Sequence, residues 1–131
     1  MGARKRLRAE QLKSEKMQTA VASLKNSPIA PRKMRLVADL VRGVEVNKAL
    51  NILQHNSKFA SKSLEKLLRS AIANWEQKNE GKSIEEENLV VKTIEVGGAA
   101  MMKRIQTAPQ GRAHRIRKRS NHVTIIVDGA K

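Results

Sequence analysis

A basic stretch of the sequence, from Val96 to Val127, holds the side chains with the clearest capacity for binding chemistry. It contains seven Lys and Arg residues and no Asp or Glu. The seven are Lys103, Arg104, Arg112, Arg115, Arg117, Lys118 and Arg119. The planar guanidinium group of Arg takes two phosphate oxygens at once and stacks on bases. The stretch is therefore predicted to bind a polyanion, and that binding should depend strongly on salt because counterions are released.

Two segments rich in β-branched residues border this stretch, and both are predicted to be strands. They are residues 89–96 (LVVKTIEV) and 122–127 (HVTIIV). Two glycines after the first strand mark where it bulges or leaves the domain, and Pro109-Gln110-Gly111 is suited to a turn. The sequence therefore predicts that the two strands pair antiparallel and extend outward as a β-hairpin arm over about residues 97–122.

The conformation of the arm decides how its cations are displayed. In an extended chain, alternate side chains face opposite sides. One face then carries Arg115, Arg117 and Arg119, and the other carries His114, Ile116 and Lys118. A helix would instead align three arginines at spacings of three and four, and a disordered basic loop is a third interpretation. Gly111 and the strand-forming flanks favour the extended hairpin, whose two faces would both meet phosphate.

Two further groups of cations lie outside the arm. Residues 1–18 have too few apolar side chains for a wide stripe, so this basic extension is predicted to be partly helical at best when free. Its leading cations are Arg4, Lys5, Arg6 and Arg8. A second group, in the first turn of a helix that begins at Pro31, consists of Arg32, Lys33 and Arg35. Cations there oppose the helix dipole, which indicates an external anion. A solvated charged face explains them equally well.

Apolar residues at helical spacing predict three helices that supply most of the core. The first runs from Pro31 to a closing Gly43, and the other two cover residues 46–54 and 58–78. Residues 19–24 are a candidate strand before them. The chain is therefore predicted to form a single α+β domain over residues 19–131, preceded by the basic extension.

The overall composition narrows the class of partner. The 131 residues fit one domain and carry a formal net charge of +15, for which nucleic acid is the first candidate and a membrane surface the second. No segment is long and apolar enough to cross a bilayer, and the first residues lack the apolar core of a secretory signal. Cysteine is absent, which suits a reducing compartment. Phe59 and Trp75 are the only aromatic residues, which argues against folds that stack several bases on rings.

No pattern typical of catalysis is found in the sequence. The three histidines lack metal-ligand spacing, and there is no cysteine to assist them. Glu85, Glu86 and Glu87 are adjacent, so they are predicted to share one solvated loop instead of forming an acid–base pair. No nucleophile with a matching base and no phosphate-binding glycine loop is present. The prediction is that the chain has no catalytic residues, no metal site and no cofactor.

Several motifs occur in the order found in one known family. They are PRKMRLVADLVRG, EVNKALNIL, SAIANWE, MKRI and GRAHRIRKRSNHVTIIV. Over about residues 19–128 the chain resembles bacterial large-subunit ribosomal protein twenty-two. The resemblance implies an α+β fold, with three helices packed on a small three-stranded antiparallel sheet and a long protruding β-hairpin. It also implies a cytoplasmic structural constituent of the large ribosomal subunit, which binds ribosomal RNA, supports assembly and lines the peptide exit tunnel with its hairpin.

The resemblance assigns roles along the arm. Met102, Lys103, Arg104 and Ile105 match the outgoing strand, and Gly111, Arg112, Arg115, Arg117, Lys118 and Arg119 match the return. The tip that is expected to line the tunnel, near the nascent peptide, is Gln106, Thr107, Ala108, Pro109, Gln110 and Gly111. Family tips often carry basic residues, whereas this tip is neutral, so it is expected to line the wall by shape and amide groups. Residues 1–18 also depart from the family pattern, and our hypothesis is that they follow an RNA groove.

The sequence thus predicts a structural RNA-binding protein of the ribosome, with neighbouring ribosomal proteins as further partners and no homo-oligomer. The main alternative is an architectural DNA-binding protein with β-arms. Such arms usually end in an apolar wedge, and Pro109 beside Ala108 is a poor one. A nuclease is a third hypothesis, and it requires metal-dependent turnover.

Overall fold

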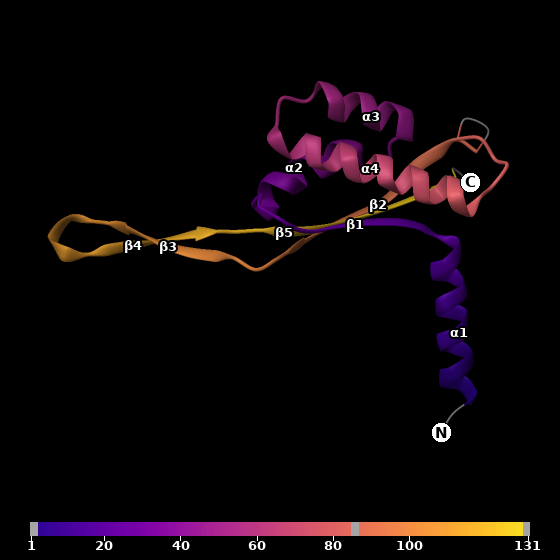
Figure 1. Ribbon diagram of the computed structural model, residues 1–131, viewed down its shortest axis with the longest axis horizontal. Helices are drawn as coiled ribbons and strands as arrows, with labels where there is room; N and C mark the ends of the chain where they lie inside the picture. The colour runs from indigo at the N-terminus through magenta and orange to yellow at the C-terminus, as the bar shows by residue number, and fades with distance from the viewer. Residues whose placement is uncertain (1–2, 85–86, 130–131) are drawn as a thin grey trace.

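The computed structural model describes residues 3–84 and 87–129 of the chain. A three-stranded antiparallel sheet lies at its centre, in the order β1-β5-β2. Its strands are β1 (Ala20–Ser27), β5 (Asn121–Gly129) and β2 (Leu89–Gly98). Helices α2, α3 and α4 cover one face of the sheet, and a two-stranded arm extends from one end (Figure 1). The predicted α+β architecture with a protruding hairpin is confirmed.

Helix α2 (Pro31–Val41) begins where the sequence predicts, with proline at its first position. The ring of proline fixes a helical φ, and its missing N–H has no partner in the first turn to lose. The inner face buries Met34, Val37, Ala38 and Val41. Gly43 follows in a turn with a φ of +73°, which glycine adopts without the strain of a side chain. The helix is therefore closed by the predicted residue.

Helices α3 (Val46–His55) and α4 (Phe59–Lys78) complete the helical layer. The apolar residues of α4 recur at three and four positions, so they form one stripe that faces the sheet and the other helices. The buried members of that stripe are Ala60, Leu64, Leu67, Leu68, Ala71 and Trp75. The cations on the other faces of α4 are exposed. Together with the inward residues of the sheet, these helices form one apolar core.

The inward positions of the sheet follow a period of two, except at one register shift in β1, between Leu24 and Ser27, and one in β2. In β5 every second residue is buried, as expected of a strand with one covered face. In β2 the register shifts between Val91 and Thr93, so Lys92 is an extra residue opposite β5. A bulge of this kind moves the alternation by one residue. Val91 and Ile94 consequently both reach the core, although they are three residues apart.

Helix α1 (Ala3–Gln18) occupies the segment that the sequence predicts to be partly helical at best. Residues with high intrinsic helix propensity dominate it, chiefly Arg, Lys, Leu, Gln, Glu and Ala. Arg6 also pairs with Glu10 one turn further on, at 3.1 Å between Nε and Oε1. The helix stands away from the domain, at the opposite end from the arm (Figure 1). The described chain therefore has four helices instead of three, because local propensity forms this one without a core.

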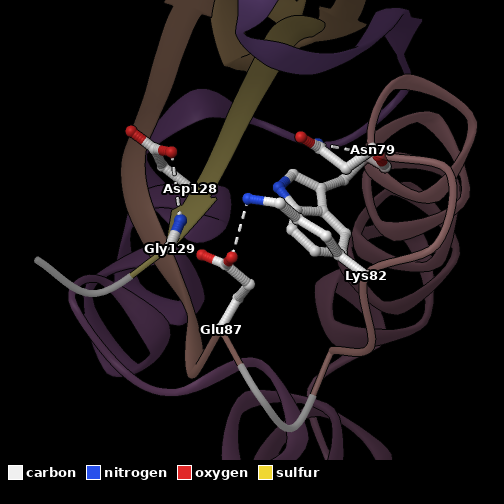
Figure 2. Close-up of polar contacts among 6 residues, drawn as sticks. Asn79, Lys82, Glu87, Asp128 and Gly129 are labelled. Carbon is white, nitrogen blue, oxygen red and sulfur yellow. Dashed lines mark hydrogen bonds and ion pairs between the residues drawn. The ribbon is translucent and has the colours of Figure 1, made fainter.

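The loop between α4 and β2 is held by short polar contacts (Figure 2). Lys82 Nζ lies 2.7 Å from Glu87 Oε1. Glu87 is half-buried, and its Oε2 lies 3.2 Å from the point where a side chain on Gly129 would begin. Glu87 keeps 38% of its side chain exposed, so it lies in a solvated loop as predicted, and it also forms an ion pair with Lys82. Glu85 and Glu86, which carry the same prediction, lie outside the described residues.

Candidate nucleic-acid interface

The arm consists of β3 (Met102–Thr107) and β4 (Ala113–Lys118), which pair antiparallel with no break in register. The chain is extended here, as the strand-forming flanks predict, and not helical. Every residue of the two strands is exposed except Ile116, which is half-buried. Figure 1 shows the arm projecting well beyond the helices. Within the described residues neither face of the arm rests on the domain, so both faces are open to a partner.

The register distributes the cations over two faces. One face carries the cross-strand pairs Lys103–Arg117 and Ile105–Arg115, and the other carries Met102–Lys118, Arg104–Ile116 and Gln106–His114. Arg115 and Arg117 share a face, as predicted, but Arg119 lies beyond the end of β4 and outside this alternation. Like charges directly opposite each other destabilise a pair of strands. The pairing of Lys103 with Arg117 therefore favours an anion between them.

No ion pair within the described residues neutralises a cation of the arm. The six described pairs lie in the helices, in the turns beside them, in the loop after α4 and between β2 and β5. Arg104 turns back along its own strand, where its Nη1 donates to the carbonyl oxygen of Lys103 at 2.9 Å. The charge of the arm is thus left for a partner to compensate, and such a field attracts anions and speeds their association.

Hydrogen bonds fix the root of the arm to the domain. Asn121 is fully buried at the start of β5, and its Nδ2 donates to the carbonyl oxygen of Ile29 at 2.6 Å. Arg35 Nη2 donates to the carbonyl oxygen of Val96 at 3.1 Å. Sequence reasoning missed Asn121, although one signal was available. This residue starts the period-two series of inward positions in β5, where a polar side chain needs a specific partner.

The domain sheet includes the two ends of the predicted arm. Gly97 and Gly98 pair with His122 and Asn121, so all four belong to the β2–β5 ladder. One more bond, from the N–H of Ala99 to the carbonyl oxygen of Ser120 at 3.0 Å, follows outward. The regular strand pairing then stops, and it resumes where β3 and β4 pair with each other. The arm is therefore an outward continuation of the two strands that carry the core.

The tip of the arm is a tight turn. Residues Pro109–Gly111 form a single 3₁₀ turn, in which Gln110 and Gly111 have φ angles of +61° and +70°. The N–H of Ala108 donates to the carbonyl oxygen of Arg112 at 3.0 Å and closes the loop. Gln106 and Thr107, which the resemblance assigns to the tip, are the last two residues of β3. The neutral segment is thus part strand and part turn.

The remaining predicted cations fall into two places. Arg32, Lys33 and Arg35 are exposed on the first turn of α2, and the bond from Arg35 to Val96 ties that turn to the arm root. Arg4, Lys5, Arg6 and Arg8 are exposed along α1. The structure therefore brings the α2 group near the arm and leaves the α1 group at the far end of the domain (Figure 1).

Residues 3–84 and 87–129 offer neither a metal site nor a membrane-spanning helix. No group of three or more His, Cys, Asp or Glu residues in these ranges could hold a metal ion. No described helix combines the length and the apolar character needed to cross a membrane.

The fold and the exposed cations together define a small basic α+β domain that carries a protruding cationic arm. Comparison with protein families gives a specific match. The family model described as ribosomal protein L22p/L17e matches residues 6–128. The chain belongs to this family of ribosomal proteins, which is not a family of enzymes.

Curated relatives agree over nearly the whole chain. A protein of Christiangramia forsetii is 63% identical over 127 residues, which cover 97% of this chain and 94% of the relative. A protein of Flavobacterium johnsoniae is 61% identical, covering 97% and 93%. One of Porphyromonas gingivalis is 59% identical, covering 98% and 95%. All three are named large ribosomal subunit protein uL22. The recognition made from the motifs is confirmed, and the family match begins well before residue 19, so it includes most of α1.

Proposed function

We propose that this chain is a structural constituent of the large ribosomal subunit in the cytoplasm, and that its arm binds large-subunit ribosomal RNA. The observation that carries the proposal is the arm itself. Its stretch of chain holds seven cations and no acid, and the strand residues are exposed on both faces. Membership of a ribosomal protein family supports RNA as the polyanion.

The proposed binding mechanism follows from the absence of an apolar core beneath the arm. A two-stranded hairpin without a core beneath it is marginal in water, and opposed like charges weaken it further. Phosphate groups would remove the repulsion between Lys103 and Arg117 and give their side chains partners. RNA therefore completes the fold of the arm, while the domain holds its root in place through Asn121 and Arg35.

The neutral tip has a separate role in this proposal. Residues Gln106 to Gly111 carry no charge, so they gain little from phosphate, and they are placed furthest from the domain. We assign them to the wall of the peptide exit tunnel, next to the nascent peptide. There the tight turn supplies shape, and Gln106 and Gln110 supply amide groups. Through its RNA contacts the protein also supports assembly of the subunit beside neighbouring ribosomal proteins.

The α1 and α2 cations extend the interface. Arg32, Lys33 and Arg35 lie beside the arm root and meet the same RNA. Helix α1 presents Arg4, Lys5 and Arg8 to a groove in a second stretch of RNA; Arg6 is already paired with Glu10. An exposed helix of 16 residues is marginal in isolation, so a partner that orders it is expected.

Sedimentation tests the proposal in cells. The tagged chain should remain with the large ribosomal subunit after a high-salt wash, and its recovery in the soluble fraction would contradict the assignment.

Equilibrium binding separates RNA from DNA. Affinity for structured large-subunit ribosomal RNA should exceed affinity for duplex DNA of equal length at each of several salt concentrations. Preference for duplex DNA at moderate salt would favour an architectural DNA-binding protein. Cleavage of labelled RNA in the presence of Mg²⁺ would instead indicate a nuclease.

Deletion of residues 1–18 tests α1. The truncated chain should enter ribosomes less efficiently and should lose RNA contacts in a structure of the subunit. Unchanged incorporation with unchanged RNA contacts would remove α1 from the interface.

A further inference from the structure

A groove lies between the first turns of α2 and α4, outside the arm. Its volume is about 540 Å³, and it is lined by Pro28, Ile29, Ala30, Lys33, Leu36, Lys58, Phe59 and Ala60. Ile29 and Ala60 are buried and form its floor. Leu36 and Phe59 stand at its sides with 58% and 71% of their surface exposed. Pockets that hold small organic groups have roughly this size, about 300–1,000 Å³.

Phe59 is unusual within this chain. The sequence has two aromatic residues, and the other, Trp75, is buried in the core with 4% of its surface exposed. Among the Phe, Tyr and Trp rings of the described chain, that of Phe59 is therefore the only one exposed to a partner. A single exposed apolar residue needs no explanation. Phe59, however, lines the groove together with a second exposed apolar side chain, Leu36.

The charge of the groove selects the kind of occupant. Its only charged lining residues are Lys33 and Lys58, and no acid lines it. The first turns of both helices also lack an acidic residue, which leaves their positive dipole ends uncompensated. An occupant must therefore combine a flat apolar face for Phe59 with negative charge for the two lysines. A nucleotide has both, in its base and its phosphate.

The groove adjoins the arm root. Ile29, in its floor, accepts the 2.6 Å hydrogen bond from Asn121, the buried residue at the start of β5. Figure 1 shows the N-terminal ends of α2 and α4 at the end of the domain from which the arm departs. RNA that lies along the arm thus has a direct path to the groove.

We propose that this groove holds one unstacked base of the RNA, which stacks on Phe59 while its flanking phosphates meet Lys33 and Lys58. The inference rests on the proposed function and deepens it, because it adds a base-binding subsite to an interface made otherwise of phosphate contacts. Protein–RNA recognition commonly uses bases that are splayed out of single-stranded loops and stacked on aromatic side chains.

Substitutions at Phe59 test the subsite with full-length protein and bacterial large-subunit ribosomal RNA. Phe59→Ala should weaken binding by about 5- to 150-fold, the range for loss of one base stack. Phe59→Leu should weaken it comparably, because it keeps apolar surface but removes the ring. Phe59→Trp should retain affinity, and its added fluorescence should be quenched by RNA above the constant signal of buried Trp75. Leu40→Ala, an exposed apolar change on α2 outside the groove, is the matched control and should stay within about twofold of wild type.

Salt dependence separates the two kinds of contact. Phe59→Ala should leave the slope of log affinity against log salt unchanged, whereas Lys33→Gln and Lys58→Gln should each reduce it by about 0.7 to 0.9.

Three results overturn the subsite. If Phe59→Ala binds RNA as the wild type does, no base stacks there. If Phe59→Leu retains full affinity, the contact is apolar only. If Phe59→Ala binds free RNA normally but fails to enter subunits, the groove holds a ribosomal protein. In each case the wild type still binds RNA, so the proposed function stands. Failure of the wild type to bind would overturn both.

Discussion

Strands β2 and β5 of the domain sheet continue outward as β3 and β4 of the arm, forming one two-stranded ribbon. The two ends of this ribbon are stabilised differently. In β5 every second residue is buried, while in β4, a few residues earlier, no residue is. The domain end of the ribbon is covered by three helices, and the arm end is covered by nothing within the described residues. The comparison teaches that one ribbon can be stabilised by apolar burial at one end and lack that burial at the other, where the proposed function assigns the stabilisation to RNA.

Two isoleucines offer the largest contrast between these ends. Ile125 in β5 is 1% exposed, and Ile105 in β3 is 76% exposed. Ile125→Ala should lower the free energy of unfolding by about 2–5 kcal/mol, because it leaves a cavity in the core. Ile105→Ala should change it by less than about 0.5 kcal/mol. Denaturant unfolding followed by helical circular dichroism measures both, and equal losses would mean that the arm shares the core's stability.

Removal of charge from the arm should weaken RNA binding without lowering the free energy of unfolding. The double variant Arg115→Gln with Arg117→Gln should reduce the slope of log affinity against log salt by about 1.4 to 1.8, for two lost phosphate contacts. The control, Lys62→Gln with Lys66→Gln on the exposed side of α4, makes the same change in net charge. If the control lowers the slope equally, RNA senses only the total charge, and the arm has no special place in binding.

The link between domain and arm should show a smaller effect. Arg35→Gln removes the hydrogen bond to the carbonyl oxygen of Val96 and should destabilise the protein by about 0.5–1 kcal/mol. Arg32→Gln, one residue after the start of the same helix, removes a charge without a described bond and should stay within about 0.5 kcal/mol. Thermal unfolding of the two variants compares them. Identical melting temperatures would show that the Arg35 bond does not hold the root.

The ion pair of Lys82 with Glu87 should contribute least. Both side chains are partly in water, at 55% and 38% exposure, so solvent screens their attraction. Lys82→Gln should cost less than about 1 kcal/mol, and the loss should shrink further in 1 M salt. Urea unfolding at two salt concentrations checks this. A loss as large as that of Ile125→Ala would mean that the loop after α4 governs the fold.

Much of this architecture could be predicted from the sequence, because its signals are local. The period of the apolar residues predicts α2, α3 and α4, and the β-branched segments predict β2 and β5. Pro31 begins α2 and Gly43 follows its end, and both act through their own backbone preferences, which do not depend on the rest of the chain. The absence of acids from the arm likewise follows from the sequence, and the register then confirms that Arg115 and Arg117 share a face.

Other features depend on contacts between distant segments, which no local pattern contains. The bulge at Lys92 exists because β2 must bring both Val91 and Ile94 to the core. The bond from Asn121 to Ile29 joins residues 92 positions apart. The groove beside Phe59 appears only when two helix ends meet. The helical content of residues 1–18 is underestimated for a different reason. The sparse apolar residues argue against a helix, whereas the high helix propensity of the other residues forms one.

Amide hydrogen exchange of the full chain, with and without large-subunit ribosomal RNA, tests the central claim most directly. In free protein the arm, residues 99–120, should exchange fast while residues 64–75 of α4 are protected, since only the domain has a core. Added RNA should protect the arm and leave α4 unchanged. Protection of the arm in the absence of RNA, or an arm that stays fast when RNA is bound, would contradict an arm completed by its partner.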